Sequence, residues 1–585
     1  MGEPKKTDVD VIALELVNNS LTSIIDTMAL TMCRTCYSHV VREIFDFATG
    51  LTDADGNIVA EGRVNPSHSG VMPTTVRTIR KIWGDRIYPG DVFMCNDPFE
   101  GASHLPDIYT IRPVFIDNEL VAFCGSIAHQ LDVGGRTPGS NACDNTEIFQ
   151  EGVRIPPLKY YERGVRNYTL YRILEKNVRI HEKVLGDLES QVAGTTIGEK
   201  RFIELAQHWG GWPTLKKHIS NLLDYSERMT RAAIKELPDG SWEFEDFMDD
   251  DGFSPDPVRF HVKITIKGED ITFDLTGSSR QTRGSINLPY TSTLGVIYTG
   301  VRVLINPEVP ANGGVHRAVK IIAPPGTVVN AAFPIGVAGR GATIGRLWDA
   351  VLGALAKIAP DRVPADTTGI DYGVCLGGTD SSGNPVVFTD FLMGSWGGRP
   401  NADGISACTS PWMNYSVDQA EPIEHSNPLR IEQYSLVPDS GGAGKYRGGL
   451  GMVRDYRLLF NDPLVQWRVD RADFPAWGLA GGKPGALAES YHISGRKKRK
   501  LRKSIFIANN GDLLRAILPG AGGWGPPYER DIERVVTDVR NEKVSPEAAR
   551  RDYGVAIDPV TFEVDRKETK RLRGEMKKAA DTKTS

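Results

Sequence analysis

Two histidines and an aspartate flank a pair of apolar runs between residues 104 and 135, in the stretch HLPDIYTIRPVFIDNELVAFCGSIAHQLDVGG. The runs are separated by Asp117-Asn118-Glu119, which is typical of the turn in a β-hairpin. If the two strands pair about the centre of this turn, Asp107 becomes the cross-strand neighbour of His129. His104 lies three residues before Asp107. We therefore expect two imidazoles and one carboxylate to converge at the open end of the hairpin.

Such a set of side chains suits a divalent cation that keeps open coordination positions. Imidazole favours zinc or iron and carboxylate favours harder ions such as manganese, so the residue types do not select the metal. Each histidine taken alone could equally cap a strand or fill a polar gap, but His104, Asp107 and His129 together favour a metal site. Asp132, three residues after His129, could be a further ligand, a partner that holds a ligand in place, or a turn cap.

Other glycine-rich or charged stretches offer weaker chemistry. GVAGRGATIGR, residues 336–346, could cradle an anion at a helix N-terminus, but it matches neither Walker A nor the dinucleotide fingerprint, and a tight turn into a helix explains it better. DSGGAGKYRGGLG, residues 439–451, also fails Walker A. GRKKRKLRKS, residues 495–504, favours a solvated β-hairpin with a basic tip over a nucleic-acid site. The sequence therefore predicts a metal site without an ATP site of its own.

The composition indicates a globular protein with a sizeable core and no general attraction to polyanions. The 585 residues are 40% apolar and 24% charged, with a net charge of −5. The N-terminus lacks the apolar segment of a signal peptide, and the longest apolar runs are too short for a membrane span. Seven thinly spread cysteines do not predict a disulfide framework. We expect a cytoplasmic protein that binds neither nucleic acid nor membrane.

A mixture of helices and hairpins is expected to position the histidines. Apolar residues recur at helical spacing over residues 8–45, which predicts one long helix. FDFATGLTDADGNIVAEG predicts two strands joined by a tight turn at Asp55-Gly56. Further helices are predicted at residues 74–83, beyond residue 170 in a segment rich in helix formers, and at residues 213–236.

The pattern changes near Pro238-Asp239-Gly240. Short apolar runs between glycine and proline turns predict strands up to about residue 332, and residues 365–530 are rich in glycine, with short strands. The charged C-terminal end is expected to fray. We predict an α+β chain in three parts: a helical and β-hairpin metal-binding region (1–238), a β-rich, glycine-rich domain with an embedded helix near 341–358 (239–545), and a charged tail (546–585).

Six stretches carry a resemblance to a known family: PGDVFMCNDPFEGASHLPDIYTIRPVF, AHQLDVGGRTPGS, TEIFQEGVRIPP, SLVPDSGGAGKYRGGLG, WGLAGGKPG and LPGAGGWGPPYERD. Through them the chain resembles the hydantoinase B subunits of the hydantoinase/oxoprolinase group. The likeness runs in family order from about residue 40 to residue 560. Relatives in this group include N-methylhydantoinase, 5-oxoprolinase, caprolactamase, and the acetone and acetophenone carboxylases.

The resemblance implies a division of labour between two subunits. A hydantoinase A-type partner with an actin-like ATPase fold binds ATP and phosphorylates the substrate, and the B-type subunit holds one divalent metal (Zn, Mn or Fe) and completes the reaction. The expected function is therefore that of the metal-binding subunit of an ATP-dependent hydantoin, oxoproline or lactam hydrolase. A subunit of an ATP-dependent ketone carboxylase is the alternative, and a non-catalytic scaffold for the A-type partner is a second alternative.

The resemblance also assigns roles to residues. It places the metal ligands at Asp46, His104, Asp107 and His129. Asp132 and Glu147 lie in matching stretches and are candidates for acid/base catalysis. Where the family often has two adjacent histidines, this chain has His129-Gln130, so the role of the second histidine is left open.

Overall fold

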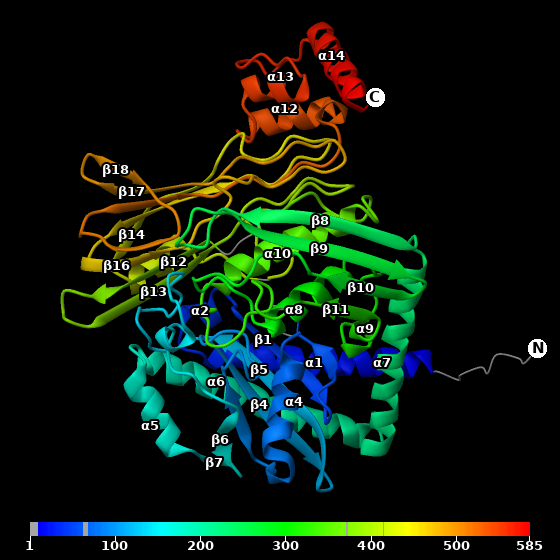
Figure 1. Cartoon of the computed structure of the whole chain (residues 1–585), viewed down its shortest axis with the longest axis vertical. Helices are drawn as coiled ribbons and strands as arrows, with labels where there is room; N and C mark the ends of the chain where they lie inside the picture. The colour runs from blue at the N-terminus through cyan, green and yellow to red at the C-terminus, as the bar shows by residue number, and fades with distance from the viewer. Residues whose placement is uncertain (1–9, 63–67, 69, 370–371, 414, 585) are drawn as a thin grey trace, which may run out of the picture.

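Helices and four sheets make up the structure, a computed structural model that describes residues 10–62, 68, 70–369, 372–413 and 415–584. The predicted α+β class is confirmed. Figure 1 shows the N-terminal sheet and its helices at the bottom, the β-rich sheets in the middle and the last helices at the top. None of the helices in these ranges has the length and apolar character needed to cross a lipid bilayer.

A seven-stranded sheet contains the predicted hairpin at its centre. The strand order is β2-β1-β5-β4-β3-β6-β7. The strands are β1 (Phe47–Asp53), β2 (Ile58–Glu61), β3 (Val92–Cys95), β4 (Asp107–Ile116), β5 (Glu119–His129), β6 (Leu158–Glu162) and β7 (Val165–Arg166). The turn at Asp55-Gly56 joins β1 to β2 as predicted. Because β4 and β5 pair with each other and with β3 and β1 on either side, the hairpin is held on both edges.

Helices cover both faces of this sheet, since its central strands are apolar on both sides. Ile111 and Phe123 face α4, whereas Val114 and Cys124 face the layer formed by α1, α6 and α7. The helices of this region are α1 (Val11–Thr35), α2 (His39–Arg42), α4 (Met72–Trp83), α5 (Tyr168–Asn177), α6 (His181–His208) and α7 (Trp212–Lys235), with the 3-10 turns η1 (Gly84–Arg86) and η2 (Ile148–Gln150).

The prediction of one helix over residues 8–45 is wrong beyond Thr35, where α1 ends. The carboxylate of Asp187, on α6, accepts hydrogen bonds from the backbone N–H groups of Tyr37 (2.7 Å) and Ser38 (3.1 Å). These bonds satisfy backbone donors outside the helix, so the chain leaves its axis before the short α2 begins. The break matters because it delivers Asp46 to the start of β1.

The second sheet, of order β11-β10-β9-β8, follows directly from α7. Its elements and the helices packed near it are β8 (Gly240–Met248), β9 (Val258–Lys267), β10 (Asp270–Asp274), α8 (Tyr290–Val301), α9 (Gly313–His316), β11 (Val319–Ile322) and α10 (Arg340–Ala356). The embedded helix predicted near 341–358 is α10. Residues 290–301, expected to be β-structure, form α8 instead, because this apolar segment packs against α10 in the largest core cluster.

Two further sheets, of order β13-β12-β16-β19 and β14-β15-β20-β17-β18, complete the β-rich part. Their strands, with one short helix, are β12 (Tyr372–Thr379), β13 (Pro385–Leu392), α11 (Ala420–Ser426), β14 (Leu429–Leu436), β15 (Met452–Leu458), β16 (Asn461–Trp467), β17 (Glu489–Ser494), β18 (Lys497–Lys500), β19 (Ser504–Ile507) and β20 (Leu513–Ile517). The predicted basic-tipped hairpin is β17–β18.

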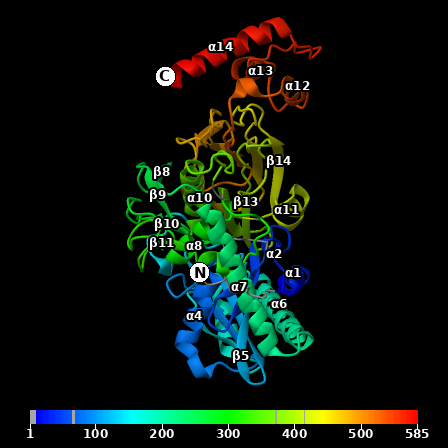
Figure 2. The same cartoon turned by 90° about the vertical axis from the view of Figure 1, so that its right-hand side faces the viewer.

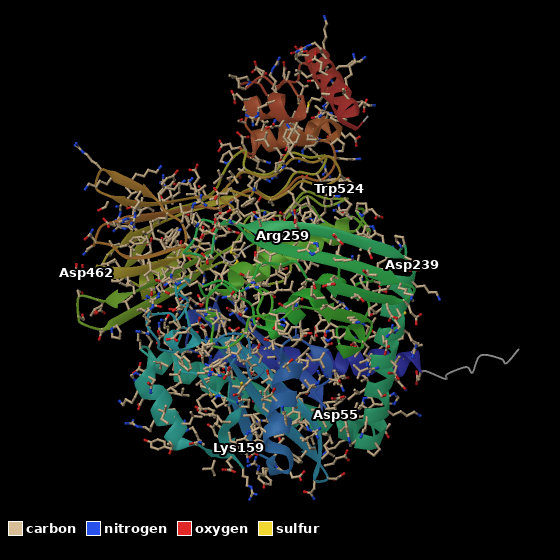
Figure 3. All side chains as sticks on the ribbon, in the orientation of Figure 1. Asp55, Lys159, Asp239, Arg259, Asp462 and Trp524 are labelled. Carbon is tan, nitrogen blue, oxygen red and sulfur yellow. The ribbon has the colours of Figure 1, made fainter. Side chains whose placement is uncertain are left out.

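Glycine-rich segments between these strands lie backbone against backbone. A Cβ at Gly448 would stand 2.0 Å from the carbonyl oxygen of Ala521, so only glycine fits there. Trp524, labelled in Figure 3, lies where these segments meet the C-terminal helices and packs on the ring of Tyr446. The composition of residues 365–530 is therefore explained by close main-chain packing.

The charged C-terminal end is helical, which corrects the expectation that it frays. The elements are η3 (Pro527–Glu529), α12 (Ile532–Arg540), α13 (Pro546–Tyr553) and α14 (Arg566–Thr584). Asp565 caps α14 by accepting the N–H groups of Lys567 and Glu568, and Arg571 pairs with Glu568 and Glu575 along the helix. Figure 2 shows these helices standing at one end of the molecule, beyond the β-rich part.

Candidate metal centre

The hairpin register brings three predicted ligands together. Asp107 and His129 are paired across β4 and β5, with 3.1 Å between Oδ1 of Asp107 and Nδ1 of His129. Nε2 of His104 lies 2.9 Å from the same carboxylate oxygen and 3.2 Å from Nδ1 of His129. One donor atom from each residue lies within 4.8 Å of the other two. The three side chains therefore converge as the sequence predicted.

Asp46, the ligand implied by the family resemblance, lies at the same place. Its backbone carbonyl accepts a hydrogen bond from the N–H of His129 (3.0 Å), and its Oδ2 is 3.8 Å from Nδ1 of His129. Burial, opposed by nearby His129, raises the pKa of Asp46 to about 7. A carboxyl with this pKa can gain or lose a proton near neutral pH.

Two residues that the sequence analysis did not assign to the site also contact Asp107. His68 places Nε2 3.4 Å from Oδ2 of Asp107, and Arg340 at the start of α10 donates a hydrogen bond from Nη2 to that oxygen. Arg340 was noted only as part of a glycine-rich turn that could hold an anion. Nothing in the spacing around His68 signals its role, because contact between residues 39 positions apart depends on the tertiary fold.

A cavity of about 20 Å³ lies beside this cluster and is lined by His104, His129, Asp46 and Arg340 among others. That volume fits roughly one ion or water molecule. The polar side of the cavity is formed by Asp46, His104, His129, Asn141 and Arg340, and its other side by Phe391, Trp412, Met413 and Tyr415. The amide of Asn141 lies 3.3 Å from Nε2 of His129. The cavity lining thus combines the polar groups of the candidate ligands with aromatic side chains.

The protonation states suit a cation. Burial, reinforced by the charge of Arg340, lowers the pKa of His104 to about 3. Burial also lowers the pKa of His68 to about 4. Although burial alone would raise it, His104, Arg340 and His68 hold the pKa of Asp107 well below its usual range. Neutral imidazoles beside an ionised carboxylate are the forms that bind metal, so this donor set fits a divalent ion.

Asp132 does not face the cavity, and it organises the loop behind it. Its Oδ2 accepts the N–H groups of Gly134 (3.0 Å) and Arg179 (2.8 Å). Its Oδ1 accepts the N–H of Gly139 (3.1 Å) and the guanidinium of Arg179 (2.9 Å). Both oxygens are engaged and buried, so the geometry fits a role for Asp132 in positioning the loop leading to Asn141.

Glu147 and Gln130 are not brought to the cavity either. Glu147 is exposed at the N-terminus of η2. Gln130 directs its amide toward Gln191 of α6 (3.3 Å). The buried acid in this stretch is Glu151, which sequence reasoning missed and whose Oε1 accepts the N–H groups of Val337 (2.7 Å) and Ala338 (2.9 Å). The carbonyl of Ala338 in turn lies 3.1 Å from Nδ1 of His104, so Glu151 supports that ligand indirectly.

This indirect support gives a testable prediction. Glu151→Ala removes the acceptor of two buried N–H groups and frees the segment that orients His104, so metal affinity is expected to fall by about 10-fold or more. Glu151→Gln is the matched control, because its amide oxygen can still accept and burial raises the pKa of the native carboxyl to about 8. Metal titration with a competing chelator measures both. Equal affinities in the two variants would contradict the positioning role.

A second group of acids, formed by Asp246, Asp349 and Asp366, also lies close together. Here Arg471 reaches all three carboxylates, and Arg346 pairs with Asp246. Guanidinium groups supply the positive charge that a metal would otherwise bring, so this cluster is an ion-pair network inside the core.

Comparison with known proteins gives three findings. The sequence profile of the family described as Hydantoinase B/oxoprolinase matches residues 10–527. A protein of Pseudomonas sp. (strain NS671), described as a candidate B-type component of a D-/L-hydantoinase, is 34% identical, over 97% of this chain and 98% of its own. The crystal structure of the ATP-dependent caprolactamase from Pseudomonas jessenii superposes with a TM-score of 0.89 at 28% identity, covering 97% of this chain and 100% of that one.

A more distant structure shares the fold. An acetone carboxylase in its nucleotide-free state, solved in work on ATP-dependent acetone carboxylation, superposes with a TM-score of 0.91 at 20% identity. The superposition covers 98% of this chain and 84% of that one.

Proposed function

The chain belongs to the hydantoinase B/oxoprolinase family, and from this premise we propose that it is the metal-binding subunit of an ATP-dependent cyclic amide hydrolase. The substrate class is a hydantoin, oxoproline or lactam that a separate A-type subunit phosphorylates. The observation that carries the proposal is the convergence of His104, Asp107 and His129, whose ligand atoms lie within 4.8 Å of one another. Both histidines also line a small cavity. A scaffold has no use for three converging metal ligands, so that alternative is disfavoured.

The chemistry explains why two subunits would divide the work. An amide carbonyl is a poor electrophile because resonance stabilises it. Phosphorylation of its oxygen makes the carbonyl carbon more electrophilic, and water adds to that carbon. The C–N bond of the ring then breaks as its nitrogen takes up a proton, and the resulting acyl phosphate is hydrolysed to a carboxylate and inorganic phosphate. His104, Asp107 and His129, with Asp46, would hold a divalent metal, which when bound lowers the pKa of water toward neutrality.

The other residues of the cavity would hold the ligands in place without help from the partner subunit. Arg340 fixes the orientation of Asp107 by donating to its second oxygen, and Asn141 does the same for the His129 ring. The rings of Phe391 and Trp412 limit access of bulk water, which strengthens the electrostatic interactions inside. Asp46, whose backbone carbonyl accepts the N–H of His129, would complete the ligand set from the start of β1.

The proposed partner is the hydantoinase A-type subunit that binds ATP. The sequence matches no Walker A or kinase pattern, and the relative with 34% identity is described as a B-type hydantoinase component. The alternative, a ketone carboxylase component, is supported by a structure at 20% identity, a level at which only the fold is informative. The hydrolase is favoured because the hydantoinase and caprolactamase relatives are more similar in sequence.

A substrate screen of the reconstituted pair tests the proposal. With ATP and its A-type partner, the chain is expected to open the ring of at least one hydantoin or lactam, at a rate that does not change when bicarbonate is removed. The isolated chain should show no ATP hydrolysis. Product formation is followed by mass spectrometry, with each subunit alone as the control. Turnover that requires bicarbonate and yields a carboxylated ketone would replace the proposal by its alternative.

A further inference from the structure

A second cavity, outside the metal centre, combines two opposite charges that do not pair. It has a volume of about 300 Å³ and is lined by the ends of β2, α8 and α9. Among the residues that the structure describes, its charged lining residues are Glu61 at the end of β2 and Arg302 just after α8. It shares no lining residue with the metal cavity, although Pro411 of one is adjacent to Trp412 of the other.

Arg302 lines this cavity, and its guanidinium forms no hydrogen bond with any residue that the structure describes. Its Nη1 atom is buried and hydrogen-bonds to nothing in the part of the chain that the structure describes. Burial, opposed by the charge of Glu61, lowers the pKa of Arg302. A buried guanidinium donor without an acceptor costs stability, so native proteins usually give such a group a partner. An oxygen-rich anionic group of a ligand in the cavity would be attracted by the guanidinium charge of Arg302.

Glu61 is the complementary group. Burial raises the pKa of its carboxyl to about 7, against the influence of Arg302. The nearest charged or titratable neighbour that the structure records for it is His316, with 3.5 Å between Nε2 and Oε1. Burial lowers the pKa of His316 to about 3, so the imidazole is neutral and supplies no counter-charge. A ligand ammonium beside Glu61 would favour the ionised carboxylate.

The remaining wall is flat and aromatic. Tyr298 and His316 stack with their ring centroids 3.7 Å apart and their planes 10° from parallel. The side chain of Asn312 is already engaged, since it donates to Ser226 and accepts from the N–H of Gly314. The described part of the lining thus offers one cation, one acid and an aromatic surface between helix ends.

We infer that this cavity binds a small zwitterion, an amino acid whose carboxylate meets Arg302 and whose ammonium meets Glu61. A simple anion would be repelled by the ionised carboxylate and a simple amine by the guanidinium, so a molecule with both charges is recognised best. The volume is at the lower end for small-molecule sites, which limits the ligand to a short chain. The inference does not depend on the reaction at the metal centre, since it concerns binding alone.

Calorimetric titration of the full chain at pH 7 tests this inference. The probes are glycine, 4-aminobutanoate and 6-aminohexanoate, compared with butanoate, hexanoate, butylamine and hexylamine. At least one zwitterion is expected to bind saturably in the millimolar range, about 10-fold or more tightly than the analogues of equal length that lack one charge. Absence of saturable binding by all three zwitterions, or equal binding of the singly charged analogues, overturns the inference.

Variants assign the binding to these two residues. Arg302→Met and Glu61→Gln are each expected to weaken the best zwitterion by about 10-fold or more. Arg86→Met, at an exposed position on η1, is the matched control and should bind normally. Metal content and thermal unfolding verify that each variant is folded, and Arg302→Met should fold because it removes an unpaired donor. Unchanged affinity in both cavity variants means that the probe binds elsewhere, which also overturns the inference.

Discussion

Replacement of Asp107 by asparagine is expected to empty the metal centre and to lower kcat/KM of the reconstituted enzyme by about 10³-fold or more. Asp107 is the residue on which the site is built, because its Oδ1 lies within 3.1 Å of nitrogen atoms from both His104 and His129. An amide oxygen carries no charge and binds a divalent cation far more weakly than a carboxylate does. Elemental analysis of the purified chain and a turnover assay with the A-type partner measure the two effects.

The matched control is Asp117→Asn at the tip of the same hairpin. Asp117 is exposed and adopts a φ of 50°, a conformation that asparagine tolerates well. This variant should keep its metal and its activity. His104→Ala supplies an independent second test, since it removes a ligand and leaves the pairing of Asp107 with Arg340 intact. Full metal occupancy in both Asp107→Asn and His104→Ala would show that the ion, if present, binds elsewhere.

The part of the site that could be predicted from sequence is the part set by local pairing. Pairing centred on the turn at Asp117-Asn118-Glu119 predicted Asp107 opposite His129, and the structure has this pair. It reaches that register through a shift between Val114 and Phe115, which the sequence analysis did not predict. His104 followed because only two residues separate it from Asp107. His68 and Arg340 could not be found this way, because each reaches Asp107 from a distant segment whose position depends on packing of the whole domain.

For the fold as well, the sequence predicted the features that local spacing determines and missed those that depend on distant contacts. α10 and α7 show clear helical spacing and appear close to their predicted ranges. α8 was missed because its sequence, YTSTLGVIYTGV, is rich in β-branched residues, and burial against α10 outweighs that local preference. The end of α1 was missed because the group that draws the chain away, Asp187, lies about 150 residues later. Local preference predicts an element, and long-range contacts decide where it stops.

Contacts in the structure cross the boundary predicted between residues 238 and 239. The largest core cluster includes Cys143 and Ile234 from the first predicted region together with residues of the second, such as Trp348 and Tyr456. A metal cavity whose ligands come from β4 and β5 and whose aromatic wall includes Phe391 likewise joins the two regions. We therefore propose that residues 1–238 do not form a functional metal site without the β-rich part, although both carry recognisable sequence patterns of their own.

Arg471→Met is expected to cause the largest loss of stability of any single change considered, about 3–5 kcal/mol. The Arg471 guanidinium lies within hydrogen-bonding or ion-pairing distance of Asp246, Asp349 and Asp366, and all four residues are buried. Methionine fills similar space but leaves the carboxylates with only Arg346 as a nearby cation. Breaking a buried network by removing one partner is costly because the remaining charges are desolvated and uncompensated.

The penalty should depend on pH in a definite direction. Burial raises the pKa values of Asp349 and Asp366, and Arg471 opposes that shift. Without Arg471 these pKa values rise further, so lowering the pH neutralises the carboxyls and relieves the cost. The difference in unfolding midpoint between Arg471→Met and the parent chain is therefore expected to be larger at pH 8 than at pH 6. Thermal unfolding at both pH values measures it, with Arg551→Met, an exposed partner of Asp552, as the control. A penalty that is small, or equal at the two pH values, would mean that the cluster is neutral or already compensated by another group.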